Sequence, residues 1–365
     1  MHLKPLNQQV VIVMGASSGI GRATALAFAE RGATVVCSAR DEGGLATLVK
    51  EIQSKGGKAV AVVAEVADAD QMRGVAEFAA QELGGIDTWV HLAAVMVYAR
   101  FEDTTPAEFA RVMEVNLLGQ IHGALAALPH LRRSGGGSLI CVSSVESVVS
   151  LPFQSAYAAS KHGVTGFLDA LRHELRREGV PINVVNILPS GINSPLFEKA
   201  LTRLGVEPRP TPPVYAPQLV ARAILHAARS PMRDIVVGGG GWALALAHRL
   251  SPALTDAILQ SPLGFASQLT DRPKSPRAPN NLFDPSPLSE ARVEGVHGAE
   301  TLRRSLLTRM TLTRAAAGVR RVARAIHGVT ARLVGFGWSA LIPRAARRSL
   351  ARRAAEAPGR RSSPS

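Results

Sequence analysis

The chain of 365 residues contains few cysteines, few aromatic residues and no long apolar run. Its two cysteines exclude a disulfide scaffold, and Cys37 and Cys141 both lie in apolar stretches typical of buried thiols in a reducing compartment. No Cys/His pairs have zinc-site spacing, so we predict no metal. No apolar run reaches the roughly 18–20 residues that span a membrane. The first residues lack a charged segment followed by an apolar stretch and a cleavage site, so we expect no secretory signal and a cytoplasmic protein.

The formal net charge of +14 is distributed unevenly. Residues 302–365 contain 15 arginines, no lysine and one acid, whereas the remaining 301 residues contain 27 basic and 27 acidic residues. The basic character therefore belongs to the tail and says nothing about the main site. Because Arg alternates with Ala, Leu and Val at helical spacing, we expect a helical C-terminal extension. Three alternatives stay open: a loosely packed extension, which we favour, a helix on an anionic membrane surface, and, least favoured, a nucleic-acid-binding tail.

Apolar, β-branched runs alternate with segments of helical period from residue 10 to about residue 238. Such alternation predicts βαβ units, and hence an α/β fold with a doubly wound (Rossmann) seven-stranded parallel sheet and helices on both faces. The expected strands are Val10–Met14, Thr34–Ser38, Ala59–Ala64, Thr88–Leu92, Ser138–Ser143, Ile182–Leu188 and Asp234–Val237.

The alternation ends after residue 238, and this change divides the chain into three parts. Residues 1–240 form the expected nucleotide-binding catalytic domain. Residues 241–301 comprise a helical stretch broken by Pro252 and a Pro-rich linker, with the four glycines Gly238–Gly241 as a hinge before them. Residues 302–365 are the basic tail.

A glycine-rich turn directly follows the first expected strand and opens the first helix. It reads Gly15-Ala-Ser-Ser-Gly19-Ile-Gly21. Glycine permits tight turning and close approach of the backbone to a pyrophosphate, which the N–H groups of a helix N-terminus bind. Such a turn also occurs without a ligand, but its strand–turn–helix context favours a dinucleotide. The spacing GxxxGxG resembles that of the short-chain dehydrogenase/reductase family, which implies cofactor contacts from Gly15, Ser17, Ser18, Gly19, Ile20 and Gly21.

Tyr157 and Lys161 form a pair one helical turn apart, and no other tyrosine of the chain has a lysine at this spacing. A nearby ammonium favours the phenolate, so such a tyrosine can exchange a proton with a substrate oxygen near neutral pH. The alternative is a buried tyrosine beside a surface lysine. Ser144 argues against it, because Ser144 ends a strand 13 residues before Tyr157, the distance found in the family.

The resemblance implies a catalytic set of Asn116, Ser144, Tyr157 and Lys161, in which Asn116 holds a water. It also implies hydride transfer at the nicotinamide C4 between an alcohol and a carbonyl, with Tyr157 as acid/base. A small-molecule substrate and a homo-oligomer are expected on the same ground. Two rival interpretations stay open: a non-catalytic NADP-binding protein and a membrane-tethered scaffold.

The end of the second strand favours NADP(H) over NAD(H) as the cofactor. NAD-dependent relatives carry an acid at the position of Ala39, where it binds the ribose 2′-OH. Here Arg40, and Arg22 at the helix start, can pair with a 2′-phosphate, although each is also an ordinary surface charge. Asp41 lies one position too late for the ribose contact.

Further cofactor contacts follow from the resemblance alone. Glu65, where relatives carry Asp, is expected near the adenine, and Ala93 is what remains of the motif after the fourth strand. Pro189, Ile192 and Ser194 follow the sixth strand and are expected near the nicotinamide.

The substrate pocket is expected beyond the carboxyl ends of the strands. Because most of the candidate residues are apolar, we predict a lipophilic substrate. For Glu146 we favour exposure to solvent over selection of a polar substrate group. The candidates are Val145, Glu146, Leu151, Phe153, Leu196 and Phe197.

Overall fold

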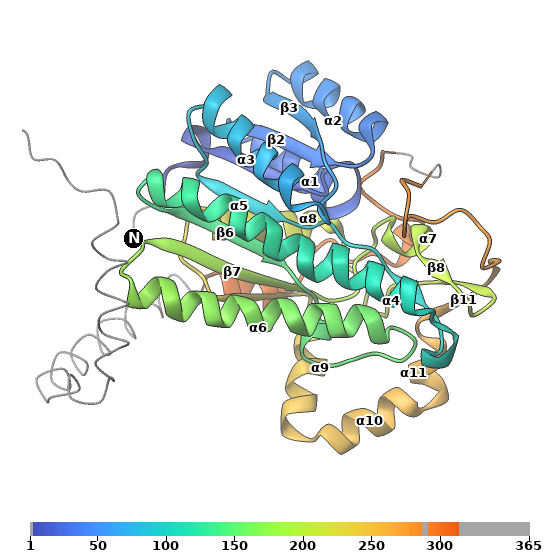
Figure 1. Ribbon diagram of the computed structural model, residues 1–365. Helices are drawn as coiled ribbons and strands as arrows, with labels where there is room; N and C mark the ends of the chain where they lie inside the picture. The colour runs from blue at the N-terminus through green and yellow to red at the C-terminus, as the bar shows by residue number, and fades with distance from the viewer. Residues whose placement is uncertain (1–2, 287–290, 314–365) are drawn as a thin grey trace, which may run out of the picture. The chain divides into compact units, whose positions relative to one another are not determined.

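A parallel sheet of seven strands lies at the centre of the computed structural model, which describes residues 3–286 and 291–313 (Figure 1). The strand order is β3-β2-β1-β4-β6-β7-β10, and every neighbouring pair is parallel. Each of the seven segments expected from the sequence forms one of these strands, which confirms the predicted α/β fold. The strands are β1 (Val10–Met14), β2 (Thr34–Ala39), β3 (Lys58–Val63), β4 (Thr88–His91), β6 (Gly137–Val142), β7 (Ile182–Pro189) and β10 (Asp234–Val237).

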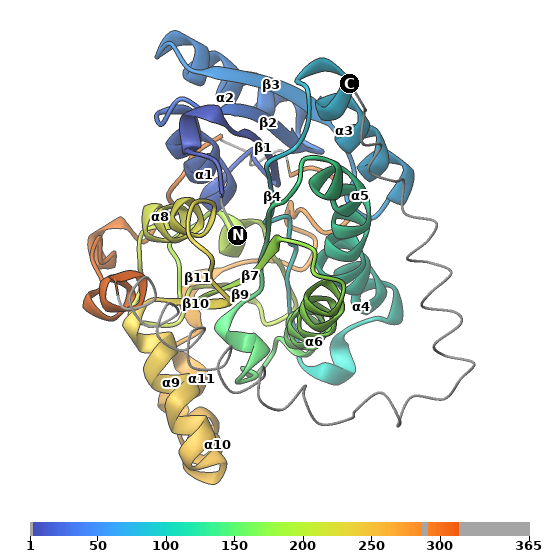
Figure 2. The ribbon, with the colours of Figure 1, turned by 90° about the vertical axis from the view of Figure 1, so that its left-hand side faces the viewer.

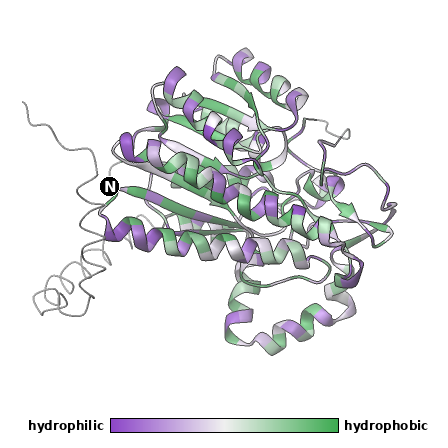
Figure 3. Ribbon diagram, viewed as in Figure 1, coloured by the Kyte–Doolittle hydropathy of each residue, from purple (hydrophilic) through white to green (hydrophobic). Residues whose placement is uncertain are grey.

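Helices cover both faces of the sheet (Figure 2). One face carries α1 (Gly19–Ala29), α2 (Glu42–Ser54) and α8 (Pro217–Ala227), and the other carries α3 (Ala69–Glu82), α4 (Pro106–Met113), α5 (Gly119–Arg133) and α6 (Ser155–Arg177). Strand residues alternate between the two cores: Val11 and Val13 pack on the first face, and Ile12 and Met14 on the second. Central strands buried on both faces are therefore mostly apolar, as the prevailing green of the sheet in Figure 3 shows.

Shorter elements surround the carboxyl ends of the central strands. Two small sheets pair β5 (Val97–Tyr98) with β8 (Leu201–Thr202) and β9 (Val206–Pro208) with β11 (Leu269–Pro273). The helices here are α7 (Leu196–Lys199), α9 (Gly239–Leu250), α10 (Pro252–Gln260) and α11 (Pro262–Ala266). The predicted break at Pro252 is where α10 begins, because proline fits the first turn of a helix but not its interior.

The glycines that we expected to form a hinge instead begin α9. The phenolic oxygen of Tyr215 accepts hydrogen bonds from the N–H groups of Gly239 and Gly240, at 2.9 and 3.2 Å. A Cβ atom at Gly241 would lie 2.6 Å from the Cβ of Ser190. Glycine is thus required for close packing of the helix start, and the hinge prediction is wrong.

The described part of the predicted tail, residues 302–313, packs on the catalytic domain. The N–H of Leu302 donates to the Val214 carbonyl at 2.8 Å, and the Thr308 hydroxyl accepts from the N–H of Gly238 at 3.0 Å. The remainder of the tail, residues 314–365, lies outside the described residues, so its expected membrane or nucleic-acid contacts stay predictions. Among the helices that the structure describes, none has the length and apolar character to cross a membrane. Both cysteines are buried, as expected.

A buried arginine joins α6 to the strands beside it. The guanidinium of Arg172 donates to the carbonyls of Val184 and Arg233 at 3.0 and 2.9 Å and pairs with Asp234 at 3.0 Å. Replacing Arg172 by Met leaves the carbonyl of the buried Val184 without this donor, whereas the half-exposed Asp234 keeps its ion pair with Arg233. We expect the free energy of unfolding, measured by urea denaturation, to fall by about 1–3 kcal/mol.

Arg132 provides the matched control for this prediction, because its ion pair with Glu178 lies on the surface. R132M is expected to cost less than about 1 kcal/mol. Equal losses for R172M and R132M would contradict the structural role of Arg172.

Candidate functional site

The turn between β1 and α1 has glycine at three positions, so no side chain covers its backbone there. Gly15 has φ +84°, and a Cβ atom there would lie 2.7 Å from the backbone nitrogen of Ala93. A Cβ atom at Gly21 would lie 2.0 Å from the Gly15 carbonyl oxygen. Since any side chain at these two positions would clash with backbone, only glycine permits this turn. The turn also begins α1, whose N-terminus favours an anion.

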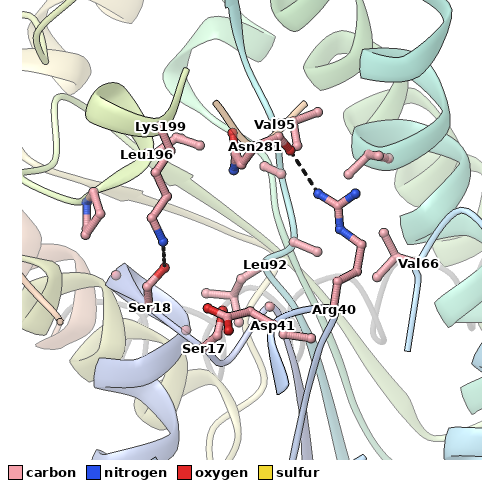
Figure 4. A pocket seen from close by; sticks show the side chains of 18 of the residues that line it. Ser17, Ser18, Arg40, Asp41, Val66, Leu92, Val95, Leu196, Lys199 and Asn281 are labelled. Atoms are coloured by element: carbon pink, nitrogen blue, oxygen red, sulfur yellow. Dashed lines mark hydrogen bonds between the residues drawn. The ribbon is translucent and has the colours of Figure 1, made fainter. Parts of the chain in front are cut away.

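A cleft lies above this turn, and most of the expected cofactor residues line it. A lysine that no sequence motif indicated, Lys199 of α7, also lines it and donates to the Ser18 hydroxyl at 3.2 Å (Figure 4). Burial lowers the pKa of this lysine. The expected residues that line the cleft are Gly15, Ser17, Ser18, Gly19, Ile20, Gly21, Arg40, Glu65, Ala93 and Ser194. The bare turn, the helix N-terminus and the lysine suit a dinucleotide pyrophosphate.

Arg40 lies on the side of the cleft opposite Lys199 (Figure 4). There it forms an ion pair with Glu65. Its guanidinium pairs with the Glu65 carboxylate at 3.2 Å, and Arg111 pairs with the same carboxylate at 2.5 Å. Two arginines therefore share one carboxylate, and Arg111 also pairs with Glu114 at 3.7 Å.

Residues 274–286 and 291–298, here called the strap, run along the rim of this cleft. The carbonyls of Asn281 and Phe283 accept from Arg40 at 2.9 and 2.6 Å. At the other end, the carbonyl of Arg292 accepts from the N–H of Gly19 at 2.9 Å. We expected an irregular linker here; the segment is largely irregular, but it contributes Asn281 and neighbouring residues to the wall of the cleft.

Arg22, the second arginine expected at the cofactor, does not line the cleft. Its guanidinium is buried beneath α2, where it pairs with Glu51 at 2.7 Å and donates to the Thr47 hydroxyl at 3.2 Å. The expectation was wrong because Arg22 lies one turn into α1 and points to the neighbouring helix. Asp41 lines the cleft and caps α2 by accepting from the N–H of Gly44 at 2.9 Å.

Ser144, Tyr157 and Lys161 meet where β6 ends and α6 begins. The Ser144 side chain lies near the Tyr157 phenol and lowers its pKa, although by less than burial raises it. The ammonium of Lys161 lies 5.4 Å from the centre of the Tyr157 ring and donates to the Val142 carbonyl at 3.0 Å. The helical spacing of Tyr157 and Lys161 and the strand end before Ser144 thus bring three side chains to one point.

Burial shifts the pKa values of Tyr157 and Lys161 in opposite directions. Desolvation raises the pKa of Tyr157 above its usual value, so the phenol holds its proton in this state. Desolvation lowers the pKa of Lys161 to about 8. The arrangement is therefore a protonated phenol beside an ammonium that still carries its charge at neutral pH.

Asn116 lies in a turn of π-helix, Glu114–Leu118, between α4 and α5. Its amide accepts from the N–H of Val95 at 2.8 Å, donates to the carbonyl of Val95 at 2.9 Å and donates to the Ser160 hydroxyl at 3.3 Å. Asn116 therefore fixes the segment after β4 against α6, three residues from Tyr157. It lines neither the cleft nor the cavity described next.

A cavity of about 620 Å³ adjoins the cleft, with the Ser144–Tyr157–Lys161 group in its wall. The cavity and the cleft share Ile20, Leu92, Ala94, Val142, Ser194 and Leu196. Pro189 and Ile192 line the cavity. Of the apolar substrate candidates, Val145, Leu151, Leu196 and Phe197 also line it, whereas Phe153 packs against Phe265 instead.

Glu146, which we expected to face solvent, lies in this cavity. Its residue surface is 6% exposed, and its carboxyl oxygen Oε2 has no hydrogen-bond partner in the described chain. Burial raises the pKa of Glu146 to about 8. The prediction was wrong because α9 and α10, distant in sequence, close this side of the cavity. No described group of His, Cys, Asp and Glu residues could hold a metal ion.

Comparisons with known proteins agree on one family. A family profile described as short chain dehydrogenase matches residues 9–204. An uncharacterized oxidoreductase of Bacillus subtilis, YxnA, is 37% identical over 286 residues, which cover 78% of this chain and 80% of the relative. The 3-oxoacyl-[acyl-carrier-protein] reductase FabG of Thermotoga maritima is 36% identical over 194 residues, covering 53% of this chain and 78% of the relative.

A solved structure agrees with these sequence comparisons. The crystal structure of a short-chain type dehydrogenase/reductase from Mycobacterium marinum is 29% identical, with a TM-score of 0.57. The match covers 65% of this chain and 96% of that chain. The similarity therefore includes nearly the whole of the solved protein but leaves a third of this chain without a counterpart there.

Proposed function

The chain belongs to the short-chain dehydrogenase/reductase family of oxidoreductases, which act on CH–OH donors, and we propose that it interconverts a lipophilic alcohol and its carbonyl compound with NADP(H). The observation that carries this proposal is the group of Ser144, Tyr157 and Lys161, which line the cavity beside the polar cleft, with the Lys161 ammonium 5.4 Å from the centre of the Tyr157 ring. The family implies NAD(P)(H) binding, and the bare glycine turn fits it.

The proposed chemistry follows from the positions of these groups. When bound, NADP(H) supplies or accepts the hydride at its nicotinamide ring. The Ser144 hydroxyl and the Tyr157 phenol both bind the substrate oxygen, and Tyr157 donates the proton as carbonyl becomes alcohol. Lys161 stabilises the developing phenolate by its charge. In the cleft, Lys199 and the helix N-terminus hold the pyrophosphate.

The preference for NADP(H) is proposed from the charges on the rim of the cleft. Ala39 provides no acid that could bind a ribose 2′-OH, and Arg40 lines the cleft. A guanidinium has five N–H donors, so Arg40 can retain its strap carbonyls and also bind a phosphate. A negative 2′-phosphate is therefore favoured over a neutral hydroxyl.

The lipophilic substrate and the oligomer are proposed on different observations. Apolar side chains from α7, α9 and α10, together with Met96, Val145 and Leu151, line the cavity, which supports an apolar substrate body. Members of the family are commonly oligomeric. The exposed Leu118 and Leu125, at the start and middle of the α5 region, support a homo-oligomer through this helix.

Replacing Tyr157 by Phe tests the acid/base assignment. We expect NADPH-dependent reduction of a lipophilic ketone to fall about 10²–10⁴-fold, because the proton donor is lost. The dissociation constant for NADPH, measured by fluorescence titration, should change less than about threefold, because the phenol adds little to nucleotide affinity. Y215F is the control, since Tyr215 bonds only the start of α9 and its removal should spare turnover. Undiminished reduction by Y157F would overturn the assignment.

Replacing Arg40 by Ala tests the cofactor preference. The dissociation constant for NADPH should rise about 10–100-fold, as expected for loss of charged hydrogen bonds, while that for NADH changes little. R22A is the matched control: Arg22 lies outside the cleft, so the ratio of the two constants should stay at its wild-type value. Equal weakening of both nucleotides in R40A would contradict the proposal.

The pH dependence of reduction tests the role of Lys161. With its pKa lowered to about 8, Lys161 is charged below this pH and neutral above it. We expect kcat/KM for ketone reduction to be level below about pH 7 and to fall as the pH rises through 8. Glu146 faces the same group and titrates nearby, and its ionisation would also oppose the phenolate.

Two variants separate these contributions. E146Q should retain the fall above pH 8 if Lys161 causes it. K161R, which stays charged, should show a lower but level rate across this range. A level wild-type profile from pH 6 to 10 would contradict the role of Lys161.

A further inference from the structure

The cavity beside Tyr157 is apolar except for a few polar groups, and two of these are buried side chains with an oxygen left unsatisfied. Glu146 Oε2 and Gln154 Oε1 have no hydrogen-bond partner among the residues that the structure describes. Their residue surfaces are 6% and 1% exposed. A buried oxygen without a partner costs about 1–3 kcal/mol, so two such oxygens in one cavity indicate that a ligand completes them.

Both side chains are held in place by their other atoms. The backbone N–H of Leu151 donates to the Glu146 carboxyl, and the Gln154 amide donates to Gln268 Oε1 at 2.8 Å. The carboxyl is also close to the catalytic group. The backbone N–H of Glu146 donates to the Ser144 hydroxyl at 3.1 Å. The negative charge of the ionised Glu146 carboxyl favours a higher pKa at both Tyr157 and Lys161. A substrate group bound by Glu146 therefore lies within a few carbons of the reacting oxygen.

The chemistry of the two oxygens selects the partner. Because burial raises the pKa of Glu146 to about 8, its carboxyl is mostly protonated at neutral pH and can donate a hydrogen bond. At higher pH the same carboxyl can only accept, as the Gln154 oxygen does at any pH. A second carbonyl on the substrate could not donate to Gln154, and an ammonium would bury a charge at high cost. A hydroxyl group both donates and accepts, so it satisfies both side chains.

We propose that the substrate is a lipophilic hydroxy ketone, or the corresponding diol in oxidation, and that its hydroxyl group accepts a hydrogen bond from Glu146 and donates one to Gln154. This inference rests on the proposed function, because it concerns the substrate of the same site. Glu146 is then a specificity-determining residue: it selects the substrate by a group other than the reacting carbonyl, while apolar walls hold the remaining chain.

The test compares 2-decanone with its 3-hydroxy and 4-hydroxy derivatives in the wild type, E146Q and E146L. In the wild type, kcat/KM for at least one hydroxy ketone should exceed that for 2-decanone about tenfold. E146L should reduce this ratio to about one, and the ratio within each protein cancels any common effect of the substitution on Tyr157 and Lys161. E146Q keeps a donor and an acceptor and should retain most of the ratio. NADPH affinity unchanged in all three proteins shows that the variants are folded.

A binding measurement separates this inference from the proposed function. Titration of the NADPH complex with 2-decanol and decane-2,4-diol needs no turnover, and the wild type should bind the diol about tenfold more tightly, whereas E146L should not. Q154L provides a second variant, with a smaller loss expected, if E146L fails to fold. Reduction of all ketones with the same ratio in wild type and E146L would overturn the inference and leave the proposed function intact. No reduction of any ketone, together with a diol preference that depends on Glu146, would overturn the proposed function and leave the hydroxyl site.

Discussion

The burial of one ammonium, that of Lys161, constrains the centre of this protein. Only 1% of the residue surface is exposed, and a buried charge without partners is costly. The Val142 carbonyl, 3.0 Å away, and the face of the Tyr157 ring compensate part of this cost. The contact with Val142 requires that the last residue of β6 and the second turn of α6 lie side by side, whereas the contact with the Tyr157 ring lies within α6. The packing of β6 against α6 therefore also sets the geometry of the proposed catalytic group.

This constraint separates two compartments of different polarity. The cleft on one side presents backbone N–H groups, the cations Arg40 and Lys199, and the carboxylates of Asp41 and Glu65, and is therefore polar. The cavity on the other side is closed by the inner surfaces of α9 and α10. A reaction between a charged cofactor and an apolar substrate needs such a boundary, because each ligand then meets an environment that matches its own solvation. Tyr157 lies at this boundary and can contact both ligands.

Local signals made the fold and the centre of the site predictable from the sequence. Apolar runs indicate the strands, and the helical period indicates the Tyr157–Lys161 pair. Both patterns are formed by residues close together in the chain. The positions of Glu146, Lys199 and Arg22 depend on what packs over them, and no spacing rule contains that information. Glu146 in particular resembles a polar residue of an exposed turn until helices about 100 residues later cover it.

The strap shows how the chain beyond the family core modifies a shared site. Relatives usually carry Asp where this chain has Glu65, and the longer side chain reaches both Arg40 and Arg111. These arginines in turn donate to strap carbonyls, at Asn281 and Phe283 for Arg40 and at Leu282 for Arg111. One substituted carboxylate thus orients two guanidinium groups, and these bind a segment about 240 residues away from Arg40 in sequence. The wall of the cleft on the Arg40 side is consequently built in part by Asn281, which lies beyond the family-profile match to residues 9–204.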